Sequence, residues 1–260
     1  MQPFPESLKS WRKAKRFSQL QLAVEADVSS RHISFLETGR ARPSRDMIGR
    51  LARAMHLPLH AHNQLLTHAG YAARYSGRRW DGEAMAPIRA AVSHMLQAHA
   101  PYPGLAIDRL WTVVQMNRPA QMMFGTLGVR EGDSLLDLLT SGRLPEHVEN
   151  WPEVAHHAAQ RLRTESAAQG GVARLDAVAD QLAGVGSAGK PVDGPVMPTI
   201  FRMGETRLSL FTTLAQFGTP EDLALEDLKI ELYFPADDTS ATLLKAMAGS
   251  ARDEDQTEQT

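Results

Sequence analysis

The N-terminal part of the chain alternates short helical patterns with turn residues. Ser18 precedes the second of these patterns as a candidate N-cap, Gly39 follows the third as a stop, and Pro43-Ser44 opens the fourth. Together they predict a compact domain of five short helices. The predicted helices span residues 6–15, 19–26, 30–38, 44–55 and 58–70.

From about Trp80 the pattern changes to a mixture of helices and strands. Runs with alternating apolar residues, rich in Ile, Val and Phe, predict strands, and the first run turns near Asp108-Arg109. The order predicts an α+β domain in which a curved antiparallel sheet carries flanking helices. Helices are expected at 82–99, 118–125, 152–166, 172–182 and 237–247, and strands at 105–117, 198–204, 206–218 and 228–235, with a hairpin over Gly204-Glu205.

These patterns divide the chain into two domains. We expect an all-α domain over residues 1–75, a linker over 76–84 and an α+β domain over 85–247. The polar, acidic residues 248–260 are expected to be disordered.

Composition removes several classes of protein. The chain of 260 residues has no cysteine, which excludes a disulfide scaffold, a cysteine-ligated zinc site, an iron–sulfur centre and a thiol nucleophile. It has no apolar run long enough to span a membrane, and its first residues lack the apolar stretch of a signal peptide. We therefore expect a cytoplasmic protein with no membrane partner.

The net charge of −2 hides two opposite halves. Residues 1–79 contain 14 basic and 5 acidic side chains, a balance of +9, whereas the rest of the chain has a balance of −11. A basic module beside an acidic one is typical of a nucleic-acid-binding domain joined to another function, although a solvated basic face would give the same count.

The segment from Ser18 to Arg40 has the pattern of a helix-turn-helix. Ala23 is small where two helices would touch, and Asp27 stands in the turn, where a left-handed conformation is needed. Polar side chains of the second helix would face the major groove of DNA, and the flanking arginines would contact phosphates. The predicted DNA-binding residues are Gln19, Ser29, Ser30, Arg31, Ser34, Arg40, Arg42 and Arg45.

This segment resembles the Cro-like, or xenobiotic-response-element (XRE), helix-turn-helix family. The resemblance rests on Ser18-Gln19, Leu22-Ala23, Val28-Ser29, Ile33, and Leu36–Arg40 followed by Pro43-Ser44. It implies that the third helix lies in the major groove and that dimers bind paired half-sites.

Over residues 4–247 the chain resembles the MmyB-like family of bacterial transcription regulators. The matching stretches are residues 31–52, 58–75, 101–117 and 217–238, with the helix that follows. The resemblance implies a PAS-like second domain with a hydrophobic pocket for a small molecule such as a fatty acid or acyl group.

A sheet folded over a cavity would line it with inward-facing apolar residues, although most such residues simply fill a core. Asn117 either caps the next helix, which is the interpretation we favour, or holds a ligand head group. The candidates for ligand binding are Trp111, Met116, Asn117, Met122, Phe124, Phe201, Phe211 and Phe217, and Val113 is a further inward position.

Two other patterns resemble functional sites but do not predict them. The glycine-rich residues 184–190 lack the preceding strand and following helix of a phosphate loop, so we expect a flexible loop. Pro58 separates His56 from His60, and no carboxylate stands nearby in the sequence, so solvated or phosphate-facing histidines are expected rather than a metal site. No acid, base and nucleophile come together, so we expect neither an enzyme nor a cofactor.

The sequence therefore predicts a homodimeric DNA-binding transcription regulator whose second domain senses a small apolar ligand. Two alternatives remain open: a DNA-binding regulator whose second domain only dimerises or binds a protein partner, and an enzyme fused to a regulator. An enzyme fused to a regulator would need a polar pocket with perturbed titratable groups.

Overall fold

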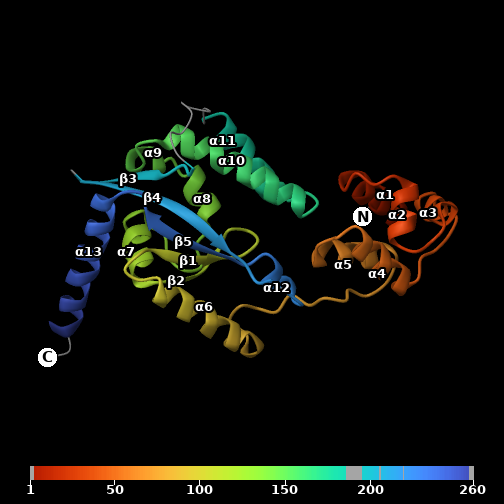
Figure 1. The fold of residues 1–260 in the computed structure, drawn as a ribbon, viewed down its shortest axis with the longest axis horizontal. Helices are drawn as coiled ribbons and strands as arrows, with labels where there is room; N and C mark the ends of the chain where they lie inside the picture. The colour runs from red at the N-terminus through yellow and green to blue at the C-terminus, as the bar shows by residue number, and fades with distance from the viewer. Residues whose placement is uncertain (1–2, 186–194, 205, 219, 258–260) are drawn as a thin grey trace. The chain divides into compact units, whose positions relative to one another are not determined.

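The computed structural model describes all residues except 1–2, 186–194, 205, 219 and 258–260 (Figure 1). It divides into two compact units. Unit 1 comprises Met1–Gly77 with two short segments from later in the chain, Ala167–Gly171 and Thr219–Glu226. Unit 2 comprises Arg78–Ser166, Val172–Gly218 and Asp227–Thr260.

Unit 1 contains the five expected helices. Ser18, Ser29 and Ser44 each accept a hydrogen bond from a backbone N–H in the first turn of the helix that follows, which explains where α2, α3 and α4 begin. Leu8, Leu22, Ile33, Leu36, Ile48, Leu51 and Leu65 form a fully buried core. The helices are α1 (Phe4–Ala14), α2 (Gln19–Glu25), α3 (Ser30–Glu37), α4 (Arg45–Ala54) and α5 (Leu59–His68), and the short α12 (Leu223–Glu226) also belongs to this unit.

The turns of unit 1 take the conformations that their residues predict. Asp27, between α2 and α3, has φ 51°, and Gly39, after α3, has φ 72°. Both values lie in the left-handed region, which Asp tolerates better than most residues and Gly enters freely. The helix-turn-helix backbone is thus confirmed.

Unit 2 is built on one antiparallel sheet of five strands in the order β2-β1-β5-β4-β3. The strands are β1 (Gly104–Ile107), β2 (Val113–Met116), β3 (Thr199–Met203), β4 (Thr206–Ala215) and β5 (Lys229–Pro235). The helices are η1 (Glu83–Met85), α6 (Ala86–Ala98), α7 (Arg118–Thr126), α8 (Leu135–Thr140), α9 (Leu144–His147), α10 (Trp151–Ala168), α11 (Ala173–Ala183) and α13 (Asp238–Thr257).

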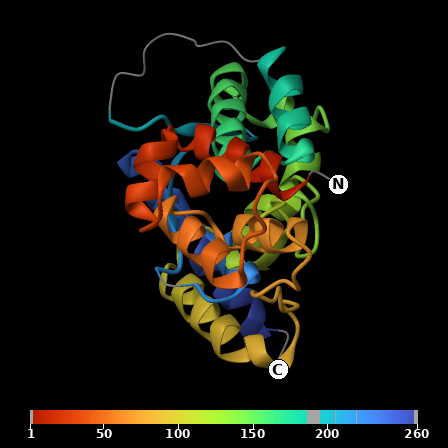
Figure 2. The same cartoon turned by 90° about the vertical axis from the view of Figure 1, so that its right-hand side faces the viewer.

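Different residues and helices pack on the two faces of the sheet. Phe211 and Phe234 stack on one face, near His99 at the end of α6. Glu231 and Tyr233 alternate with Phe234 along β5 and therefore point to the opposite face, where α10 lies. The neighbouring helices α10 and α11 are visible in Figures 1 and 2. The α+β fold class expected for this part of the chain is confirmed.

Two details differ from the sequence predictions, and a third prediction is not tested. The short helices α8 and α9 were not predicted, because each is only one or two turns long. Helix α13 continues past Met247 to Thr257, into the segment expected to be disordered, and no proline interrupts it. Most of the glycine-rich loop predicted at 184–190 falls within residues 186–194 and so lies outside the described residues.

The interpretation of His60 as solvated or phosphate-facing is wrong. The side chain is buried in unit 1, with Nε2 2.6 Å from the carbonyl oxygen of Gln169 and Nδ1 3.5 Å from the carboxylate of Glu226. These partners lie more than a hundred residues away in the sequence, which is why no local pattern indicated them. His62 is buried as well.

Candidate DNA-binding surface and ligand cavity

Helices α2 and α3 are joined by a turn that fixes their crossing. The backbone N–H of Val28 donates to the carbonyl oxygen of Ala23 over 2.9 Å, and Ala23 is almost fully buried. A larger side chain at position 23 would push the two helices apart, because the helices meet there. Leu22, Ile33 and Leu36 bury the inner sides of the two helices, which leaves the opposite side of α3 in solvent.

The exposed side of α3 begins with polar residues. Ser30 and Arg31 are exposed and Ser34 is half-buried. The Arg31 guanidinium lies 5.2 Å from the ring centroid of Phe35, one turn further along, and this contact restrains the long side chain. The Ser29 hydroxyl accepts a hydrogen bond from the backbone N–H of His32 over 3.2 Å, so it already serves as the helix cap.

Gln19 is tied into an ion network behind α3. The Arg12 guanidinium donates to both carboxylate oxygens of Glu37 over 2.5 and 2.9 Å, and the Gln19 amide donates to the same carboxylate over 2.8 Å. Burial by itself raises the pKa of Glu37, but the hydrogen bonds from Arg12 and Gln19 lower it below its ordinary value. The network therefore joins α1, α2 and α3.

The three flanking arginines are all exposed but differ in their contacts. Arg40 and Arg42 follow α3. Arg45 donates to the carbonyl oxygen of Ala72 over 2.7 Å and lies 5.6 Å from the ring centroid of Tyr71. The contacts of Arg45 hold the chain that follows α5. Its role as a phosphate contact remains a prediction.

Unit 2 contains a cavity of about 260 Å³ between the sheet and helices α7 to α10. Most of its wall is apolar. Trp111 reaches this wall from the turn between β1 and β2, where its φ of 63° lies in a region that bulky residues rarely adopt. The lining also includes Phe124, Leu127, Leu135, Leu138, Leu139, Leu144, Val148, Trp151, Val154, Ala158, Met197 and Phe201.

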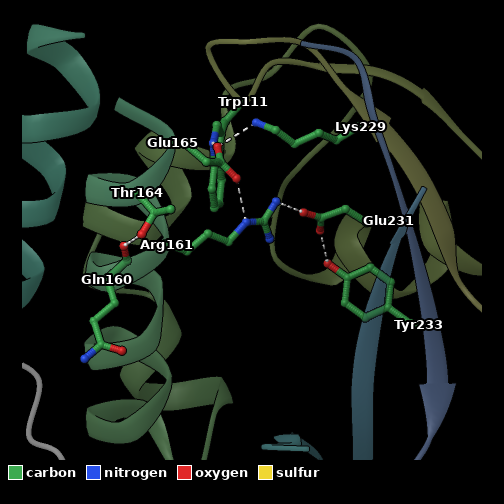
Figure 3. Close-up of polar contacts among 8 residues, drawn as sticks. All are labelled: Trp111, Gln160, Arg161, Thr164, Glu165, Lys229, Glu231 and Tyr233. Carbon is green, nitrogen blue, oxygen red and sulfur yellow. Dashed lines mark hydrogen bonds and ion pairs between the residues drawn. The ribbon is translucent and has the colours of Figure 1, made fainter. Parts of the chain in front are cut away.

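Arg161, Glu231 and Tyr233 in this wall belong to a larger network of charged and polar side chains (Figure 3). Arg161 on α10 donates from Nε to Glu165 over 2.8 Å and from Nη2 to Glu231 over 2.6 Å. Lys229 donates to Glu165 over 2.6 Å, and the hydroxyl of Tyr233 donates to Glu231 over 3.0 Å. We call Arg161, Glu165, Lys229 and Glu231, with Trp111 and Tyr233, the cavity network.

Neighbouring charges shift the pKa values of the cavity network so that Arg161 and Glu165 stay charged. Burial by itself lowers the pKa of Arg161, but the carboxylates of Glu231 and Glu165 raise it above its usual value. Burial raises the pKa of Glu165, and Arg161 and Lys229 outweigh this effect and lower it. Burial and then the Glu231 carboxylate raise the pKa of Tyr233 well above its usual value, so its phenol stays protonated as a donor.

The structure brings only some of the predicted ligand-binding residues together. Trp111, Phe124 and Phe201 line the cavity described above. Met122 lines a second cavity of about 330 Å³ between α7 and α13. The other predicted residues, Met116, Asn117, Phe211 and Phe217, line neither of these two cavities.

Two of these placements have simple physical reasons. The carboxamide of Asn117 caps α7 at the backbone N–H of Ala120 and also donates to the carbonyl oxygens of Leu96 and Tyr102, so the capping interpretation is confirmed. Phe211 alternates with Thr212, which lines the cavity, so its side chain points to the opposite face of the sheet.

The polar wall of the cavity is absent from the residues that the sequence predicts for the site. Arg161 and Glu231 are 70 residues apart, and neither belongs to a recognisable motif. Charged residues in a helix and a strand are normally interpreted as solvated. One available signal was a pair of charges, Lys229 and Glu231, at alternate positions of an apolar strand, which places both on one face.

A helix-turn-helix with a basic surface, followed by an α+β domain with an apolar-walled cavity, is the architecture of a DNA-binding transcription regulator with a second, ligand-binding domain. Comparison with protein families agrees: a helix-turn-helix family matches residues 8–61, and the MmyB-like transcription regulator ligand binding domain matches residues 88–247. The chain belongs to the MmyB-like transcription regulator family.

A search of curated proteins finds no match to the chain. Among the helices within the described residues, none has the length and apolar character needed to cross a membrane.

Proposed function

We propose that the protein is a homodimer that binds paired half-sites in double-stranded DNA and is regulated by a small apolar ligand, such as a fatty acid or acyl group. Residues 1–75 bind the operator, residues 85–247 bind the ligand, and the protein acts in the cytoplasm. Ligand binding changes the geometry of the dimer and therefore its affinity for the operator. The observation that carries the sensor part of the proposal is the mostly apolar wall of the cavity beside Trp111.

The support for DNA binding is the exposed side of α3. Ser30 and Arg31 stand at the helix start, where the side chains of a recognition helix contact base edges. Arg40 and Arg42 extend the positive surface beyond the helix end, and neither is committed to an ion pair with a described residue. The predicted DNA-binding set thus includes side chains of both kinds, base-reading and phosphate-contacting.

A DNA-binding experiment tests this part. In gel-shift titrations with DNA from the region upstream of the regulator's own gene, Arg31→Ala is expected to weaken specific binding by about tenfold or more. Arg174→Ala, an exposed arginine of unit 2 that pairs with Asp137, is the matched control and should bind as the wild type does. Affinity should fall steeply with salt. An Arg31→Ala protein with native circular dichroism and unchanged affinity would contradict the assigned role of α3.

A second experiment tests the sensor. Native mass spectrometry of the purified protein, followed by solvent extraction, is expected to reveal a bound molecule with a long apolar chain. Ala158→Phe fills the cavity and should abolish this mass, whereas Gln160→Phe, an exposed position on the same helix, should retain it. An empty wild type that also binds no added acyl compound would favour the alternative in which the second domain only dimerises or binds a protein.

A further inference from the structure

The polar part of the cavity wall determines which head group an acyl ligand can carry. Apart from it the lining is aliphatic and aromatic, with Thr199, Thr212 and His157 as further polar side chains. An acyl chain would occupy the apolar part, because burial there removes its methylene groups from water. Its head group would then meet Arg161, Glu231 and Tyr233.

The charges of the cavity network cancel. It holds two cations, Arg161 and Lys229, and two carboxylates, Glu165 and Glu231. Glu165 accepts hydrogen bonds from Arg161, Lys229 and the indole N–H of Trp111, the last over 2.8 Å. Each cation is therefore already paired with a carboxylate of the protein itself.

Arg161 nevertheless keeps one donor group uncommitted within this network. Its Nε and Nη2 bind the two carboxylates, while Nη1 makes no hydrogen bond to the residues drawn in Figure 3. The Arg161 side chain is 27% exposed, whereas that of Glu231 is only 4% exposed. The group that a ligand can reach is therefore a hydrogen-bond donor that belongs to an ion pair.

A carboxylate head group and an uncharged carbonyl head group would bind differently beside Arg161 and Glu231. A carboxylate would leave water and enter beside Glu231. It could pair fully with Arg161 only by breaking the existing ion pair, which leaves the buried Glu231 without a cation. An uncharged carbonyl oxygen needs a single donor, which Arg161 supplies while the network stays intact.

We infer that the cavity selects an acyl ligand with an uncharged, carbonyl-bearing head, such as an amide or ester, over the free fatty acid. The inference rests on the proposed function, since it assumes that the cavity binds an acyl ligand. It assigns head-group selection to Arg161 and Glu231.

Binding of matched probes to the full-length wild-type protein tests the inference directly. Decanamide, methyl decanoate and decanoate share one chain length and differ in the head, and isothermal titration gives their dissociation constants. Decanamide and methyl decanoate are expected to bind about tenfold or more tightly than decanoate, since the buried carboxylate lacks a free cation.

A charge-changing variant should reverse the preference. Glu231→Gln leaves the Tyr233 hydroxyl a partner and gives the cavity network a net positive charge, so decanoate should gain at least about tenfold relative to decanamide. Glu149→Gln removes an exposed carboxylate paired with Arg207, outside the cavity lining, and should leave the ranking unchanged. His157→Gln should also preserve the ranking, which shows that the imidazole on the wall does not set it.

The outcomes separate this inference from the function on which it rests. Decanoate that binds as tightly as decanamide to the wild type overturns the head-group selection and leaves the acyl sensor standing. If none of the three probes binds, both fail. Should Glu231→Gln not fold, the wild-type ranking alone decides, because it needs no substitution.

Discussion

Two buried ion networks hold helices together in this protein, and they differ in what lies beside them. In unit 1, Arg12 and Gln19 bind Glu37 and join three helices behind the exposed side of α3. In unit 2, Arg161 binds Glu165 and Glu231 and joins α10 to the sheet. Only the second network contributes residues to the cavity of about 260 Å³.

Because of this difference, the network of unit 1 has a structural role, whereas we assign the similar network of unit 2 a role in ligand recognition. The Glu37 carboxylate has three donors from two side chains, and the network acts on DNA binding only through the position of α3. In the cavity network, too, each cation is paired with a carboxylate. Arg161, however, lines the cavity and has one N–H group that none of the residues drawn in Figure 3 accepts. Four predictions test this comparison.

The largest effect is expected for Arg161→Met. The substitution leaves Glu231 with Tyr233 as its remaining partner in the cavity network, so the free energy of unfolding of unit 2 should fall by about 3–5 kcal/mol. Urea unfolding of the full chain measures it. Adding Glu231→Gln to this variant removes the unpaired charge and should recover most of the loss. A decrease below about 1 kcal/mol would mean that the network adds little to stability.

Arg12→Met should have a smaller effect on unit 1. Glu37 would keep the hydrogen bond from Gln19, so we expect a loss of about 2–3 kcal/mol. Because α3 loses its connection to α1, DNA affinity should fall as well, although Arg12 lies on the buried side of the unit. Equal stability of Arg12→Met and the wild type in urea would remove the basis for the comparison.

Acid should weaken the unit 1 network. The pKa of Glu37 is lowered in the folded protein, so its carboxylate contributes stability that is complete above the unfolded pKa of about 4.3 and is lost as the pH falls through the folded value. Thermal unfolding between about pH 7 and about pH 3 should show a falling midpoint in acid. Glu37→Gln should start lower and depend less on pH, and an identical pH dependence in both proteins would contradict this assignment.

The smallest effect is expected for Arg163→Ala. Arg163 lies on α10 two positions after Arg161, but its ion pair with Asp180 is exposed on both sides. Exposed pairs contribute little, so the free energy of unfolding should change by less than about 0.5 kcal/mol. A loss comparable to that of Arg161→Met would show that α10, rather than the buried network, accounts for both effects.

Local chemistry made much of the fold predictable. Serine caps, the left-handed Asp27 and the terminal Gly39 mark the ends of helices, and each acts through its nearest neighbours in the chain. Alternation of apolar residues located all five strands for the same reason. The helices α8 and α9 are too short to produce a repeating pattern.

The site was less predictable because its members come from distant parts of the chain. Alternation showed that Phe211 and Thr212 face opposite sides, but not which side encloses a cavity. The sequence predicts all four aromatic residues Trp111, Phe124, Phe201 and Phe211 at the cavity, but in the structure Phe211 does not line it.

The sequence by itself determined the helix-turn-helix, the order of the strands and longer helices, and the separation of a basic from an acidic half, since these depend on neighbouring residues and on composition. Only the tertiary structure decided that Arg161 meets Glu231 at the edge of an apolar cavity. A charged side chain on an isolated helix or strand is stabilised by water. In the folded protein it can be buried only if a charge of opposite sign pairs with it, and this pair then determines which head group of a ligand can bind beside it.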